Sequence, residues 1–265
     1  MSDDLVEVEK KFGSLNEYSI QFNRWILKPI GAWPISLCTT RNEKIISKIL
    51  IIVCWSLSLF TLIPGLLHFI LEKEDTYLKL KTIGPLSHWV IGGFNYAVLL
   101  LRKNDILHCI EHIRVDWNII TKKQDQQVML KYAKIGRYIA AFCTAFLQGG
   151  VLCTCIALGA FKTTIKNGNE TIEIYSLLCP AYKLPVQTNP THDIILGTQL
   201  LSAFITSSSA AGAFSLAAVF ASHALGQLNI MVAWINEFVN RPIDLNNVYV
   251  NKISIIVEHH LRILR

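Results

Sequence analysis

The chain has 265 residues, of which 52% are hydrophobic, and it carries 25 Lys and Arg against 19 Asp and Glu. Four long stretches contain none of these charged residues, and soluble domains do not separate charge in this way. The composition therefore excludes an ordinary soluble domain, a collagen-like chain and a coiled coil. It predicts an all-α, polytopic helical membrane protein.

The charge-free stretches are the predicted membrane spans. A bilayer core of about 30 Å needs about 20 apolar residues in a helix that rises about 1.5 Å per residue. Each stretch is at least that long, and together they cover residues 49–71, 82–101, 138–161 and 194–236. The fourth is about twice as long as a bilayer requires. We therefore expect a span over 194–223 and a cytosolic extension over 224–265 that contains the start of another helix.

The basic residues set the predicted orientation of the spans. Three segments hold 19 of the 25 basic residues: 1–48, 102–137 and 224–265. The positive-inside rule places such segments in the cytosol, so the N-terminus is predicted to be cytosolic. A short outer loop then lies within 49–101, and a longer one covers 162–193. The acceptor tripeptide that begins at Asn169 falls in the longer loop, which predicts N-glycosylation there.

The segment 1–48 contains one predicted helix before the first span. Leu15, Tyr18, Phe22 and Trp25 recur on one helical face, and the chain then meets a series of prolines and glycine. This pattern predicts a short helix at the inner membrane surface. A helix folded back against the bundle is the open alternative.

A helical apolar stripe continues after the second span. Ile110, Ile113 and Trp117 lie on one face, which predicts that the second helix continues into the cytosol. The segment after the fourth span has similar spacing at Leu225 and Leu228. We expect these five residues to pack the cytosolic helices together and against neighbouring subunits.

Three spans carry polar, aromatic or small residues at a matching outer depth. In chain order they are His88, Trp89, Gly92 and Tyr96; Phe146, Gly150, Cys153 and Ala157; and Gln199, Ser202, Thr206 and Ser209. In hydrocarbon such groups face protein or a cavity. Two interpretations stay open, contacts between helices or a site for a small, mostly apolar ligand. Trp89 also suits an anchor at the membrane surface.

We expect no catalytic residues, metal or cofactor. Residues 108–112 fit the His-x-x-Glu-His pattern of one metalloprotease class, but they lie on a charged helix with no further ligand indicated, which favours a solvated helix face. The predicted spans contain no Asp, Glu, Lys or Arg, which argues against ion-coupled transport. Nucleic acid is not an expected partner, because the basic excess follows the membrane topology.

Five segments form an ordered series along the chain. They are FNRWILKPIGAWP over 22–34; CIEHI with the later Asp-Trp over 109–117; Met129, Ala133, Gly136 and Arg137; CPAY over 179–182; and HALGQL over 223–228. This series resembles insect odorant receptors, particularly those of ants, bees and wasps. The resemblance extends over essentially the whole chain.

The resemblance implies a seven-helix subunit of the plasma membrane with a cytosolic N-terminus. Such a subunit forms an odorant-gated, non-selective cation channel as a hetero-tetramer with a shared co-receptor. Its pocket for a small volatile ligand lies in the outer half of the bundle, between the second, third, fourth and sixth helices, and its cytosolic helices form the subunit anchor.

The family's pore is lined by the seventh helix, so we expect this chain to be a fragment with three of the four pocket walls. A gustatory receptor and a small-molecule membrane transporter are the alternatives.

Overall fold

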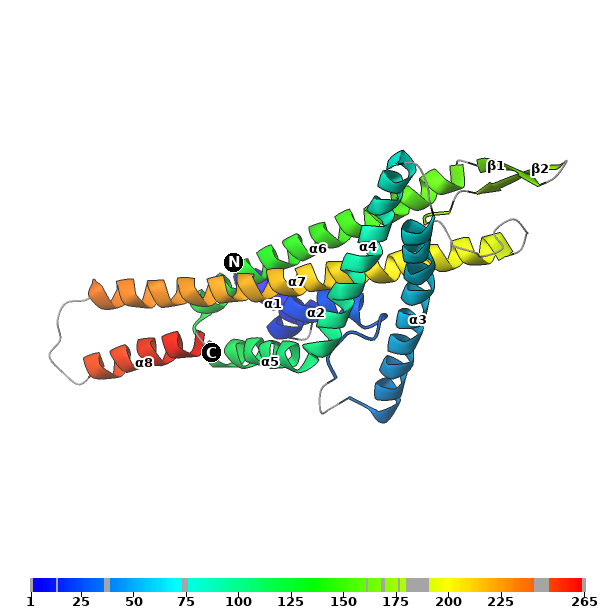
Figure 1. Cartoon of the computed structure of the whole chain (residues 1–265). Coiled ribbons are helices and arrows are strands. Elements are labelled where there is room, and N and C mark those ends of the chain that lie inside the picture. The colour runs from blue at the N-terminus through cyan, green and yellow to red at the C-terminus, as the bar shows by residue number, and fades with distance from the viewer. Residues whose placement is uncertain are drawn as a thin grey trace. The chain divides into compact units, whose positions relative to one another are not determined.

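The computed structural model describes residues 2–12, 14–35, 39–72, 76–160, 162–167, 170–175, 177–179, 191–240 and 248–263. Within these ranges the regular secondary structure is helical apart from one β-hairpin (Figure 1). The elements are α1 (Ser2–Phe12), α2 (Leu15–Leu27), α3 (Arg41–Leu71), α4 (Thr76–Leu101), α5 (Lys103–Ile119), α6 (Lys123–Ala160), β1 (Lys162–Asn167), β2 (Glu170–Tyr175), α7 (Thr191–Val239) and α8 (Val248–Ile263).

Three of the described helices are long and apolar enough to cross a membrane. They are α3, the Lys123–Ala157 part of α6, and α7. They contain the first, third and fourth predicted spans. The second predicted span lies in α4, which is not among the three. A fourth span therefore stays a prediction.

Local sequence signals account for the ends of α3. The side chain of Thr40 accepts a hydrogen bond from the Glu43 amide at 3.4 Å, which satisfies one of the amides left unpaired at a helix N-terminus. The helix continues through Pro64 and ends after Leu71, where Glu72 takes an extended conformation. The predicted first span thus begins two turns inside a longer helix.

The hairpin lies within the predicted outer loop over 162–193. Its strands pair antiparallel, from Lys162 opposite Tyr175 to Asn167 opposite Glu170. Both strands contain Thr and Ile, and in the sequence they are separated by the two residues Gly168-Asn169, a pair that is typical of a tight hairpin connection. Asn169 lies outside the described residues, so the predicted glycosylation site stays a prediction.

The chain divides into two compact units. Unit 1 consists of Met1–Phe22, His108–Ala141 and Ser215–Arg265, and unit 2 consists of Asn23–Leu107 and Phe142–Phe214. The boundary falls inside α2, α5, α6 and α7, so each of these helices contributes residues to both units. Each unit has its own hydrophobic core.

The core of unit 1 joins segments that are far apart in the sequence. Trp117 from α5, Met129 from α6 and Ile230 from α7 are buried together in it. Leu15 at the start of α2 belongs to the same core, while Trp25 near the end of that helix is 65% exposed. The beginning of α2 therefore packs against the core of unit 1.

The core of unit 2 lies among α3, α4, α6 and α7. Leu86 and Trp89 of α4, Val151 of α6 and Ala203 of α7 are buried in it, with Leu62 and other α3 side chains packed against them.

The turn that follows α2 is also part of unit 2. Gly31 has φ +69°, a left-handed conformation that glycine adopts without a steric penalty. Its carbonyl oxygen accepts hydrogen bonds from the Ser47 hydroxyl at 3.0 Å and the Lys103 ammonium at 2.8 Å. The neighbouring Ile30 carbonyl accepts from the Tyr96 hydroxyl at 2.7 Å. These bonds tie the turn to α3, α4 and the start of α5.

Candidate functional site

Polar side chains of α4 and α7 meet inside unit 2. The Trp89 indole donates a hydrogen bond to the Ser202 hydroxyl at 2.9 Å. One turn further along α7, the Thr206 hydroxyl lies 3.0 Å from Nε2 of His88. The next turn brings the Ser209 hydroxyl to the Gly92 carbonyl at 2.8 Å. We call these residues of the two helices the α4–α7 polar contact.

The α4–α7 polar contact is buried because the two helices approach each other closely. Trp89, Ser202, Thr206 and Ser209 are at most 1% exposed. A Cβ atom placed on Gly92 would lie 2.6 Å from the Cβ of Thr206, closer than real side chains approach. The glycine thus permits the hydroxyl groups to reach across, and buried polar groups are then paired as folding requires. Of the set, His88 is the member that is only half-buried.

Gln199 and Tyr96 have separate partners. The Gln199 amide donates to the Cys179 carbonyl at 2.8 Å and accepts from the Cys179 amide at 3.3 Å, so it holds the chain that follows the hairpin. Cys179 is fully buried as a free thiol, and burial raises its pKa to about 11, which keeps it protonated at neutral pH. Tyr96 points to the turn after α2 and lies outside the α4–α7 polar contact.

The structure does not bring the four candidates of the third span to this site. Phe146 is 72% exposed, and Gly150, Cys153 and Ala157 lie on the same exposed side of α6. The residues that α6 turns toward the core of unit 2 are Val151 and Cys155, and the Gln148 amide donates to the Ser208 hydroxyl at 2.7 Å. Most residues on both sides of α6 are apolar, so spacing did not distinguish the sides, although the polar Gln148 marks the packed one.

The predicted assembly residues divide in the same way. Ile110, Ile113 and Trp117 are buried in unit 1. Leu225 is 51% exposed and Leu228 38% exposed, so in this chain they are not part of that core. Their proposed role against a neighbouring subunit stays a prediction.

The α4–α7 polar contact contains hydroxyl, imidazole, indole and backbone carbonyl groups and no carboxylate, Lys or Arg. Such a set can bind and orient hydrogen-bonding groups. Elsewhere, the His108 and His112 rings lie 4.8 Å apart, and Glu111 is 3.8 Å from Arg114. The described part of the chain holds no group of three side chains placed to bind a metal ion.

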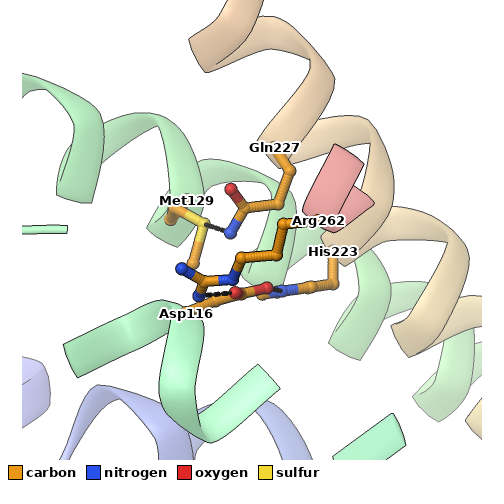
Figure 2. A network of polar contacts seen from close by, with 5 residues as sticks. All are labelled: Asp116, Met129, His223, Gln227 and Arg262. Carbon is orange, nitrogen blue, oxygen red and sulfur yellow. Dashed lines mark hydrogen bonds and ion pairs between the residues drawn. The ribbon is translucent and has the colours of Figure 1, made fainter. Parts of the chain in front are cut away.

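A second polar network, which the sequence did not indicate, lies in unit 1. Asp116 of α5 accepts hydrogen bonds from His223 of α7 at 2.7 Å and from Arg262 of α8 (Figure 2). Burial opposes ionisation of Asp116, but His223 and Arg262 outweigh it and hold the pKa of this carboxyl below its ordinary value. The three residues are more than 30 positions apart in the chain, so only the fold reveals the network.

Comparison with protein-family models and with curated proteins found no match to this chain.

Proposed function

We propose that the chain is part of an odorant receptor subunit, which opens a non-selective cation channel in the plasma membrane together with a co-receptor. The observation that carries the proposal is the α4–α7 polar contact, in which buried hydroxyl and indole groups and a half-buried imidazole meet between two helices. The ordered sequence series described above and three helices able to cross a membrane also support it.

The ligand class follows from the surroundings of the contact. The core of unit 2 is formed by aliphatic and aromatic side chains, which favour an apolar molecule. The half-buried His88 is the group through which a ligand oxygen reaches the polar contact. We propose that the ligand is a small volatile molecule with one hydroxyl, ester or carbonyl group. The oxygen of this group forms a hydrogen bond that replaces the one between His88 and Thr206.

The proposal is tested by recording ligand-evoked currents. The chain, extended by the helices that a seven-helix subunit requires, is expressed with the co-receptor in a cell without odorant receptors. Thr206→Val removes the hydroxyl and keeps the shape of the side chain. We expect it to change the potency of oxygen-bearing ligands about tenfold, equal to about 1.4 kcal/mol, and to leave hydrocarbon ligands unchanged.

Ser215→Ala is the matched control. Its hydroxyl is also buried on α7, but it donates to the Ala140 carbonyl in unit 1 at 3.4 Å, away from the polar contact. If both variants reach the surface and neither changes the order of ligand potencies, the α4–α7 polar contact only joins the two helices. Ligand-driven flux without the co-receptor would instead indicate a transporter.

A further inference from the structure

Unit 1 contains a cavity of about 340 Å³ among α5, the start of α6, the end of α7 and α8. This volume falls at the lower end of the range for small-molecule pockets, about 300 to 1,000 Å³. Much of the wall is apolar and comes from Ile119, Ile120, Trp234, Phe238, Ile255 and Ile256. The cavity lies in a different unit from the α4–α7 polar contact, so it is not the site of the proposed function.

The charged residues on the cavity wall are already engaged with protein groups. Asp116 is bound by His223 and Arg262 (Figure 2). Asp125 accepts a hydrogen bond from the Trp234 indole at 3.1 Å, and the Lys122 ammonium lies 5.9 Å from the centre of the Trp234 ring. Glu237 also has a partner within the protein. Asp116 and Arg262 therefore balance each other's charge, and Asp125, Lys122 and Glu237 each have a contact within the protein.

Two hydrogen-bond acceptors on the wall lack a partner. Gln227 is 3% exposed, and its amide nitrogen is directed to the Met129 sulfur at 3.1 Å, which leaves Oε1 unpaired (Figure 2). Nε2 of His259 is also buried without a partner. Burial lowers the pKa of His259, although a backbone hydrogen bond to Gln227 opposes this shift, so the imidazole is neutral at pH 7 and carries an acceptor nitrogen.

We propose that this cavity binds a small, uncharged, mainly apolar molecule that carries a hydroxyl donor, such as a phenol or an alcohol. The apolar wall encloses the hydrocarbon part of the ligand, and the hydroxyl donates to Gln227 Oε1 or to His259 Nε2. An unpaired buried acceptor is costly, so a donor at this place stabilises the unit. Water molecules also supply donors, but they leave the apolar wall in contact with water, whereas the hydrocarbon part of a ligand covers it.

The test measures binding of two fluorinated probes to the purified full chain in lipid nanodiscs at pH 7. The probe 4-fluorophenol has the donor, and 4-fluoroanisole has a similar ring without it. Fluorine NMR follows each titration, with empty nanodiscs as the background for partition into lipid. We expect saturable binding of the phenol and an affinity for the anisole that is about tenfold weaker.

Three variants locate the site. Ile256→Trp fills the cavity and should abolish saturable phenol binding, whereas Ile253→Trp, at a 48% exposed position outside the lining, should not. Gln227→Leu should weaken phenol binding three- to tenfold and bring it close to that of the anisole. Gln148→Leu is its control, because Gln148 also has a buried unpaired Oε1 but lies in unit 2.

Each contrary result overturns a stated part of the proposal. Absence of saturable phenol binding to the native chain removes the site. Equal affinity for phenol and anisole removes the role of the donor, and unchanged binding in Ile256→Trp places the ligand elsewhere. Because the probe comparison uses the native chain, poor folding of a variant does not prevent the decision.

Discussion

At the scale of single residues, glycine decides how closely α4 and α7 approach. Gly92 and Gly93 are neighbours on α4, but they face different surroundings. A Cβ added to Gly92 would collide with Thr206 of α7, whereas a Cβ added to Gly93 would meet nothing within 4 Å. Substitution of Gly92 thus reports mainly on helix packing, and substitution of Gly93 reports mainly on helix propensity.

We predict that Gly92→Ala destabilises the chain by about 1 to 3 kcal/mol, because the added methyl group must push Thr206 away. Gly93→Ala should have no such effect and should stabilise α4 by up to about 1 kcal/mol, since alanine favours a helix more than glycine does. The midpoint of thermal unfolding in detergent measures both. Equal midpoints for the two variants would show that the helices do not touch at Gly92.

At the scale of elements, residue spacing predicted which segments are helical better than it predicted which side of a helix is buried. On α4 and α7, hydroxyl groups and histidine marked the buried side, and the structure brings His88 and Thr206 together. On α6, Phe146 on the exposed side and Val151 on the packed side are both apolar, and Gln148 is the polar residue that could have marked the packed side. A chemical difference between the two faces of a helix, which is weak on α6, is what allows its orientation to be predicted.

The attachment of α8 to unit 1 should depend on pH. His259 of α8 has a pKa below its ordinary value of 6.5, chiefly because burial disfavours its charged form. The His259 imidazole therefore binds a proton more readily when α8 is detached than when α8 is packed. Attachment of α8 thus weakens as the pH falls below 6.5. The contribution of Asp116 to this attachment is lost only at lower pH, because the pKa of its carboxyl group is held below 3.8.

Hydrogen–deuterium exchange of the α8 amides between pH 6.5 and pH 5, corrected for intrinsic exchange rates, measures this effect. We expect protection to fall with pH in the native chain and to stay nearly constant in His259→Phe. His260→Phe, at the exposed neighbouring position, should keep the native dependence. The same slope in the native chain and in His259→Phe would assign the effect to another group.

At the scale of the whole molecule, the distribution of charge was the most informative property of the sequence. The length of the charge-free stretches predicted helices that the structure contains, and three of them are able to cross a membrane. The Asp116 network could not be predicted, since His223 is 107 positions and Arg262 is 146 positions away from Asp116. The hairpin had a readable signal in the sequence, because the pair Gly168-Asn169 separates two short segments that contain Thr and Ile.

The predicted orientation has a direct test at Asn169. If 162–193 is an outer loop, expression in a cell with N-glycosylation should give a glycosidase-sensitive mass shift that Asn169→Gln removes. An acceptor tripeptide inserted within 102–137 should stay unmodified, because that segment is predicted to be cytosolic. Modification of the inserted site, with none at Asn169, would reverse the topology.

The turn at Gly31 has a consequence for biosynthesis. Its carbonyl oxygen bonds Ser47, which is 16 positions later, and Lys103, which is 72 positions later. The adjacent Ile30 carbonyl accepts its hydrogen bond from Tyr96, which is 66 positions later. As the ribosome delivers the chain from its N-terminus, Ser47 arrives early, whereas Tyr96 lies near the end of α4 and Lys103 follows that helix. The turn is therefore completed late, and the first helices must remain nearby until α4 has left the ribosome.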